Sequence, residues 1–239
     1  MNSYTNPFTV AAAAPYARAA FYRRTYGLVA LSCVAFGVVL AALLASPIAD
    51  VLTSLFFGNG MFGWLIVIAA FWGISAFANR LAFTGASAGT QLSGLGLYAV
   101  LEAVIFTPVL NVCLKIFGAE VTVNEIVLPA AAATLLLALG LTLTVFMTRT
   151  DFSFLRAFVN IGIFVALGAI VVFWLAGINP GTWLIVALIA LMAAAILWYT
   201  WIVKERLRPD QHVAAALLIF SGIATMFWYF VQLFISRRQ

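Results

Sequence analysis

Residues 157–203 read AFVNIGIFVALGAIVVFWLAGINPGTWLIVALIALMAAAILWYTWIV, and this stretch contains no Asp, Glu, Lys or Arg. It is too long for a single crossing of a bilayer, because about 20 apolar residues are enough for one transmembrane helix. The GINPG segment at 177–181 divides it, since Gly, Asn and Pro together are typical of tight turns. The stretch therefore predicts two transmembrane helices, at 157–176 and 182–203, joined by a short turn.

The rest of the chain is also mostly apolar, with few charged residues. Hydrophobic residues are 66% and charged residues 8% of its 239 residues, so a water-soluble domain of this length could not cover its surface with polar groups. Five further apolar segments are predicted to cross the membrane, at about 27–45, 59–77, 92–114, 126–147 and 213–235. We expect an all-α, polytopic membrane protein, with a seven-transmembrane-helix bundle at residues 25–236 and a tail at residues 1–24.

The basic residues lie singly or in small groups at the ends of these spans, and such residues concentrate in cytoplasmic loops. If the amino terminus is cytoplasmic, nine of the 12 lie on that side: Arg18, Arg23, Arg24, Arg80, Arg149, Arg156, Lys204, Arg206 and Arg208. The amino terminus is therefore predicted to be inside. Because the charges form no continuous face, we expect no nucleic-acid partner.

Two features of the chain ends have two interpretations each. Seven crossings place the carboxy terminus outside, but Arg237 and Arg238 favour the cytoplasm, so a re-entrant last segment with six full crossings is the alternative. The amino-terminal tail has three arginines and no acid, which fits a mitochondrial presequence as well as an ordinary cytoplasmic arm. We expect a cytoplasmic arm.

Several membrane-embedded chemistries lack the residues that they require. A retinal protein needs a Schiff-base lysine deep in a span, whereas Lys115 and Lys204 lie at span boundaries. An intramembrane protease needs a buried histidine beside its serine or two buried aspartates, but the single histidine, His212, lies at an interface and no aspartate lies in a span. One histidine and no Cys/His cluster also argue against haem or metal. We predict no enzymatic activity, no cofactor, and no catalytic or metal-binding residue.

Glu102 is the one carboxylate near the middle of a predicted span. An acid at that depth costs about 2.5 to 3.5 kcal/mol on insertion scales, so something should offset the cost. One interpretation is a cation or proton handle that faces the bundle interior. The other is a protonated acid that is hydrogen-bonded to a neighbouring Thr, Asn or backbone carbonyl. Arg80 is the nearest candidate partner in the sequence, although it starts from the inner boundary.

Other polar residues also lie inside or near the ends of the spans. We expect most of them to bond a carbonyl one turn back or to bridge two helices. They are Thr107, Asn111, Thr134, Thr142, Thr144, Asn160, Thr200, Thr225 and Gln232.

Five stretches, taken in order, resemble the Bax inhibitor-1 family, including its bacterial YccA-like members. These stretches are RRTYGLVALS, LEAVIFTPVLN, TRTDFSFLRAF, AILWYTWIVKE and AALLIFSGIATMF. The most specific is residues 148–155, which look like the family's T-x-x-D-x-S-x-L motif, with Arg149, Asp151 and Ser153 inside it. The resemblance covers nearly the whole chain. It implies a seven-helix bundle with a central last helix, and a bacterial inner membrane as the location.

In several members of that family, two aspartates share a proton and latch a pH-sensitive calcium leak. The sixth-helix motif Y-D-T becomes Trp198-Tyr199-Thr200 here, so Tyr199 stands where the first aspartate would be. The seventh-helix motif L-Y-L-D becomes residues 219–222, so Gly222 stands where the second would be. Both latch carboxylates are missing, and the pH switch of those members is not expected in this chain.

Two functions remain from different classes. The first is a passive leak of calcium or protons through the lipid bilayer, with Glu102 as the remaining intramembrane ligand. The second is a non-conducting stress or quality-control protein that modulates other membrane proteins, such as a membrane protease. The missing aspartates favour the second function, and a Glu102 with no identified partner favours the first.

Overall fold

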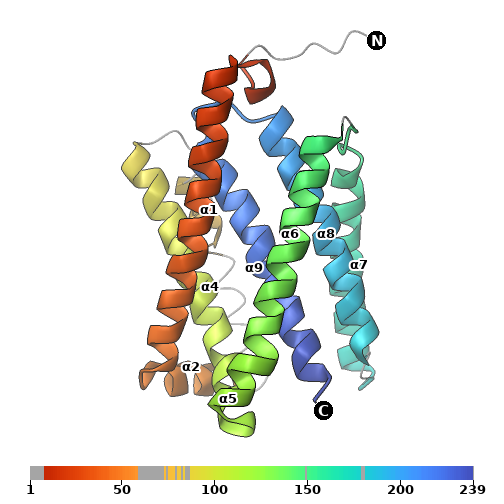
Figure 1. Ribbon diagram of the computed structural model, residues 1–239. Coiled ribbons are helices and arrows are strands. Elements are labelled where there is room, and N and C mark those ends of the chain that lie inside the picture. The colour runs from red at the N-terminus through yellow and green to blue at the C-terminus, as the bar shows by residue number, and fades with distance from the viewer. Residues whose placement is uncertain are drawn as a thin grey trace. The chain divides into compact units, whose positions relative to one another are not determined.

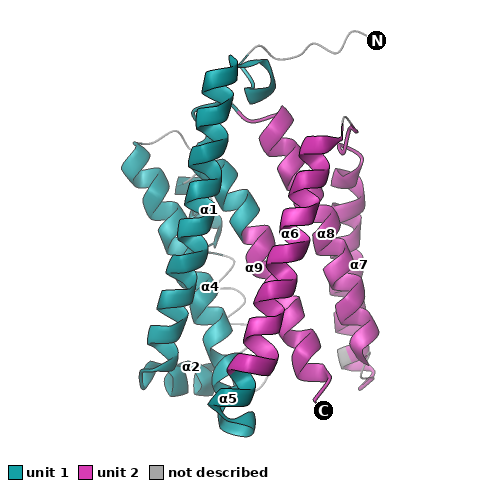
Figure 2. Ribbon diagram, in the orientation of Figure 1, with its two compact units in different colours: residues 1–122, 208–220 teal, residues 123–207, 221–239 magenta. Residues whose placement is uncertain are grey.

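The structure is a computed structural model that describes residues 8–58, 73, 75–78, 80, 81, 83, 87–148, 150–178 and 181–238. These residues form helices joined by short turns, and no strand occurs among them (Figure 1). They divide into two compact units (Figure 2). Unit 1 comprises Met1–Thr122 and Arg208–Phe220, and unit 2 comprises Val123–Leu207 and Ser221–Gln239.

Unit 1 is built around two long helices, α1 (Pro15–Leu44) and α4 (Ala88–Phe117), which pack against each other. The short helix α2 (Ile48–Phe57) packs against both of them. A turn of 3-10 helix, η1 (Val10–Ala12), precedes α1, and the one-turn helix α5 (Ala119–Val121) follows α4. The first turns of α9 (His212–Ser236) complete the unit.

Unit 2 contains α6 (Leu128–Met147), α7 (Leu155–Leu175), α8 (Gly181–Glu205) and the rest of α9. A turn of π-helix, η2 (Thr122–Val127), leads into α6. Helix α8 packs against both α6 and α7. Its Lys204 closes the end of α6, because the ammonium Nζ donates to the carbonyl oxygens of Val145, at 3.0 Å, and Thr148, at 3.3 Å.

The helix ends follow from local sequence. Pro15 occupies the first turn of α1, where its missing N–H would have had no helical partner. Gly118, with φ of 80°, ends α4 in a backbone conformation that favours glycine. Gly177 and Gly181, each with φ of 65°, flank the turn between α7 and α8, which confirms the predicted division of the charge-free stretch. Helix α4 continues through Pro108.

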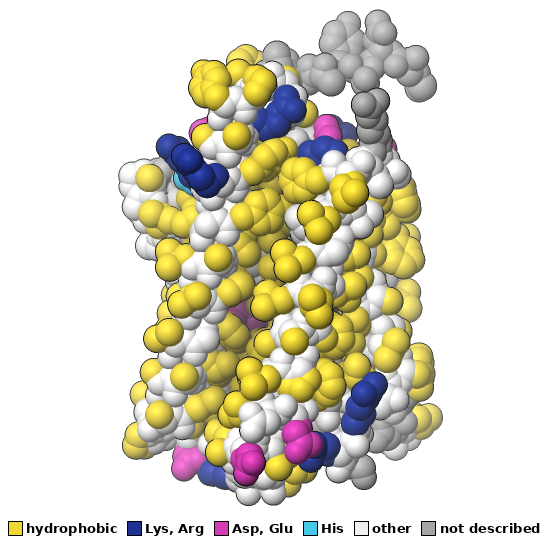
Figure 3. Space-filling view, viewed as in Figure 1, with side chains coloured by type: hydrophobic (Ala, Val, Ile, Leu, Met, Phe, Trp, Pro, Cys, Tyr) yellow, Lys and Arg dark blue, Asp and Glu magenta, His cyan; other side chains and the backbone are white. Residues whose placement is uncertain are grey.

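Within the described residues, six helices are long and apolar enough to cross a membrane. They contain the predicted spans at 27–45, 92–114, 126–147, 157–176, 182–203 and 213–235 to within a residue at their ends. Most of the predicted span at 59–77 lies outside the described residues, so the count of seven stays a prediction. Most charged side chains lie at helix ends and hydrophobic ones along the helices (Figure 3). The protein is a polytopic α-helical membrane protein.

Helix α2 lies between the predicted spans at 27–45 and 59–77 and is not itself one of the predicted spans. Its sequence, IADVLTSLFF, is apolar but too short to cross a bilayer. Its buried residues are Ala49 and Phe56, and it is tied to α4 through polar groups. A short helix of this kind depends on such tertiary contacts, since ten residues alone form a marginal helix.

Candidate functional site

Glu102 lies in α4 with 5% of its surface exposed. The residues next to it on the helix, Ala99, Ala103 and Phe106, are exposed by 2% or less. The hydroxyl of Tyr98, one turn earlier, is hydrogen-bonded to the Glu102 carboxyl. Positions four apart lie on the same face of a helix, so α4 itself brings the acid and its partner together.

Four aromatic rings form a cluster around this face of α4. Phe106 lies 5.1 Å from Phe36 of α1, and Tyr98 lies 6.1 Å from Phe220 of α9, measured between ring centroids. Phe36 and Phe220 are 6.4 Å apart, and all three contacts are edge to face. The cluster of Phe36, Tyr98, Phe106 and Phe220 therefore joins three helices at the face of α4 that carries Glu102.

The partner of Glu102 differs in kind from the groups that the sequence suggested. Tyr98 was not among the Thr, Asn and carbonyl partners expected, although its spacing of four residues from Glu102 was a signal for it. Arg80 is exposed, and its proposed pairing with Glu102 stays a prediction.

Five of the other polar groups behave as expected, whereas the buried hydroxyl of Thr200 has no hydrogen-bond partner among the described residues. The hydroxyls of Thr107, Thr134, Thr144 and Thr225 each donate to the carbonyl four residues back, at 2.7 to 2.9 Å. Asn111 instead bridges two helices, because its Nδ2 donates to Asp50 Oδ1 and to the Thr53 hydroxyl of α2, both at 2.9 Å.

Asp50 of α2 also pairs with the end of α4. Lys115 Nζ lies 2.5 Å from Asp50 Oδ1. The hydrogen bonds from Lys115 and Asn111, together with the charge of Lys115, hold the pKa of Asp50 below its ordinary value of 3.8. This group is exposed, and it fastens α2 rather than facing Glu102.

Tyr199 and Gly222 lie against each other in unit 2. A Cβ added at Gly222 would lie 3.3 Å from Cδ2 of Tyr199 and 3.0 Å from Cγ1 of Ile196. The ring of Tyr199 thus packs closely over the bare backbone of Gly222. Tyr199 and Gly222, which stand where the Bax inhibitor-1 resemblance implies two aspartates, are therefore in contact without a carboxylate at either position.

Asp151 and Ser153 lie in the turn that leads into α7. The backbone N–H of Ser153 donates to Asp151 Oδ1 at 2.8 Å, an Asx turn that starts the helix. Phe152 and Leu155 belong to a buried cluster with Val145 and Trp201. These contacts account for the T-x-x-D-x-S-x-L pattern as a structural turn; Arg149 lies outside the described residues.

A scan against protein-family models matches residues 18–239 to the family described as "Inhibitor of apoptosis-promoting Bax1". The match covers nearly the whole chain, from the first turns of α1 to the carboxy terminus. The chain belongs to this family. Searches of the curated proteins and of the solved structures found no significant match.

Membership of the Bax inhibitor family confirms the resemblance in the sequence and agrees with the membrane helices. Members of this family are not generally enzymes, and the absence of activity in this chain stays a prediction. Within the described part of the chain, no group of three or more His, Cys, Asp or Glu side chains could hold a metal ion. The buried pair of Glu102 and Tyr98 is the candidate functional site of this Bax inhibitor family member.

Proposed function

We propose that this Bax inhibitor-1-like protein is a passive proton leak pathway of the bacterial inner membrane, with Glu102 as the proton-binding group. The observation that carries the proposal is a carboxyl group with 5% exposure, inside a membrane helix, whose partner is a tyrosine hydroxyl. Ionisable residues inside the membrane are costly and commonly mark proton pathways. A carboxyl group can take up and release a proton, and a hydroxyl can donate to it in either state.

Protons fit this site better than calcium does. Calcium takes six to eight oxygen ligands, whereas Glu102 and Tyr98 together supply three side-chain oxygens. The rings of Phe36, Phe106 and Phe220 surround the same helix face and offer no oxygen. A single proton needs only the carboxyl group and its hydrogen-bond partner.

The second candidate is a non-conducting protein that modulates other membrane proteins, such as a protease. The positions that match the family's two aspartates, Tyr199 and Gly222, carry no carboxylate here, and this favours the second candidate. The ring of Tyr199 packs closely over Gly222 instead. In this alternative Glu102 is a structural acid that is satisfied by Tyr98.

Proton and calcium flux in proteoliposomes, read with internal dyes, distinguishes the two candidates. We expect Glu102→Gln to reduce the proton leak by about tenfold or more, because the amide cannot take up a proton near neutral pH. We expect Tyr98→Phe, which keeps the ring and removes the hydroxyl, to reduce it by about fivefold. Glu120→Gln is the matched control, because Glu120 is an exposed acid outside the site. Calcium flux should equal that of empty liposomes throughout.

Native protein and Glu102→Gln with the same proton flux as empty liposomes would exclude the leak. Purification of the native protein with a defined membrane protease would then support the modulator, and the same copurification with Glu102→Gln would show that Glu102 is not needed for it.

A further inference from the structure

Residues 8–13, just before α1, are docked against the protein. Val10 has no exposed surface and Thr9 has 6%, although both lie close to the amino terminus. A turn of 3-10 helix holds them, with the N–H of Ala12 donating to the Thr9 carbonyl at 3.1 Å and that of Ala13 to the Val10 carbonyl at 3.2 Å. We call residues 8–13 the strap.

Arg18 of α1 fastens the strap. Its Nη2 donates to the carbonyl oxygens of Ala11, at 2.9 Å, and Ala13, at 3.2 Å. Hydrogen bonds from a charged donor are about twice as strong as neutral ones. One guanidinium therefore ties the middle of the 3-10 turn and the residue after it to the helix that follows.

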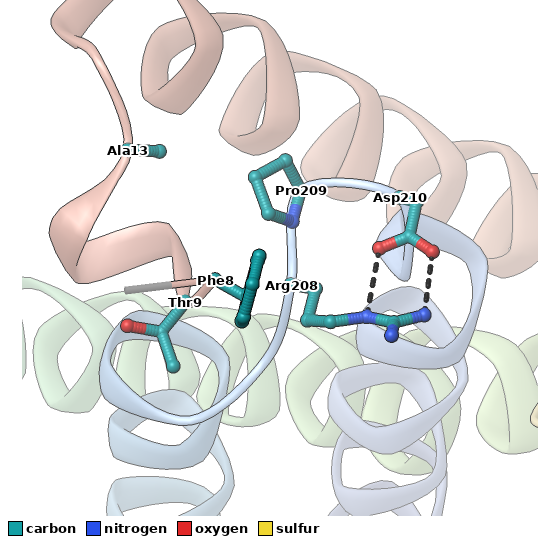
Figure 4. Close-up of a pocket in the computed structure, with 6 residues that line it drawn as sticks. All are labelled: Phe8, Thr9, Ala13, Arg208, Pro209 and Asp210. Atoms are coloured by element: carbon teal, nitrogen blue, oxygen red, sulfur yellow. Dashed lines mark hydrogen bonds and ion pairs between the residues drawn. The ribbon is translucent and has the colours of Figure 1, made fainter. Parts of the chain in front are cut away.

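The strap faces the turn that leads into α9. Phe8, Thr9 and Ala13 form one wall of a cavity of about 480 Å³, and Arg208, Pro209 and Asp210 form the other (Figure 4). This turn is itself held in shape, because Arg208 donates to both carboxylate oxygens of Asp210, from Nε at 3.2 Å and Nη2 at 2.8 Å. The strap and the turn before α9, each held in shape by its own hydrogen bonds, thus line the same cavity.

Helix α9, which begins after this turn, carries a residue of the aromatic cluster around Glu102. The residues from Val213 to Leu217 are exposed by 1% or less, so the first turns of α9 are covered. Phe220, eight residues after His212 and so about 12 Å along the helix, belongs to the aromatic cluster around Glu102. The strap therefore lies beside the turn before a helix whose first turns are covered and which carries a residue of the aromatic cluster around Glu102.

We propose that the strap closes the end of unit 1 where α1 and α9 begin, that Arg18 is its latch, and that release of the strap increases the proton leak. The inference rests on the proposed function of Glu102. The docked strap corresponds to the low-leak state, and undocking uncovers the start of α9 to water.

The test compares native protein with Arg18→Gln, which removes the latch, and with Val10→Asp, which disfavours burial of the strap. Arg23→Gln is the matched control, because it removes one charge from an exposed position on the same helix. Hydrogen exchange at the amides of Ala12 and Ala13 reports docking, and proton flux in proteoliposomes reports the leak.

We expect both strap variants to exchange these amides about tenfold faster and to raise proton flux about fivefold or more, with Arg23→Gln unchanged. Adding Glu102→Gln to Arg18→Gln should abolish the increase.

Faster exchange with flux equal to that of Arg23→Gln would overturn the strap as a control element and leave the leak in place. Unchanged exchange in Arg18→Gln would overturn Arg18 as the latch, and unchanged exchange in Val10→Asp would overturn the docked strap. Flux at the level of empty liposomes in native protein and both strap variants would refute the leak and the strap's role together.

Discussion

At the scale of single residues, the structure assigns different roles to the polar positions that the sequence singled out. Glu102 is buried beside Tyr98, whereas the carboxylate of Asp151 accepts the hydrogen bond that forms the turn before α7. Tyr199 is neither free nor a replacement acid, because its ring covers Gly222. A residue that stands out in a membrane sequence can thus be a site, a cap or a packing element, and its neighbours decide which.

The contact between Tyr199 and Gly222 predicts that Gly222→Ala lowers stability. The added Cβ would lie 3.0 Å from Ile196 Cγ1 and 3.3 Å from Tyr199 Cδ2, so both side chains must shift. Overpacking of this kind costs about 1 to 3 kcal/mol, which exceeds the gain of up to about 1 kcal/mol from replacing a helical glycine. Thermal unfolding in detergent should show a lower Tm.

Gly168→Ala is the control, because a Cβ at Gly168 of α7 meets nothing within 4 Å. Its Tm should equal or exceed that of the native protein. A Gly222→Ala variant as stable as Gly168→Ala would mean that the side chains of Tyr199 and Ile196 move aside at no cost.

At the scale of helices, the attachment of α2 to α4 depends on one exposed carboxylate. Asp50 accepts from Lys115 and Asn111, and these contacts hold its pKa below the ordinary 3.8. A depressed pKa stabilises the folded state above the ordinary value, and this contribution is lost as the pH falls through the folded value. The pairing should therefore be complete at neutral pH and fail only in acid.

The Tm difference between native protein and Asp50→Asn, measured across pH, tests this attachment. We expect the native protein to be the more stable of the two, by a constant amount between about pH 8 and 5, and the difference to shrink below about pH 4. The effect should be small, because exposed ion pairs contribute little and are screened by salt. A difference that grows on acidification would contradict the assignment.

At the scale of the whole molecule, a contact within unit 2 indicates on which side of the membrane the carboxy terminus lies. Arg238, just after α9, forms an ion pair with Glu125, which precedes α6. The end of α9 therefore lies at the same end of unit 2 as the start of α6, which the charge distribution predicts to be outside. Helix α9 is also one continuous helix long enough to cross a membrane. An acidic partner explains how an arginine is accommodated at that end.

We predict that alkaline phosphatase fused after Gln239 is active in a bacterial host, because this enzyme forms its disulfides only outside the cytoplasm. A green fluorescent protein fused at the same place should be dark. The control is the phosphatase fused after Asp210, which omits α9 and should be inactive. An inactive fusion after Gln239 would favour the re-entrant alternative.

Most of the fold could be predicted from the sequence, whereas only part of the candidate site could. The length of the apolar runs predicted the helices, and the glycines at 177 and 181 predicted a turn. Glu102 could be singled out from the sequence because an acid is conspicuous in an apolar span. Its aromatic surroundings were not found, because Phe36 and Phe220 are far from it in the sequence and resemble any other membrane phenylalanine.

The sequence by itself determined that this protein is a membrane helix bundle, because apolar runs need lipid and a backbone in lipid must satisfy its hydrogen bonds within each helix. Only the tertiary structure decided that Tyr199 covers Gly222, that α2 is fastened to α4, and that the strap lies beside the turn before α9. Those contacts join segments that are far apart in the chain. Their existence depends on how the helices pack, which hydrophobic length alone does not specify.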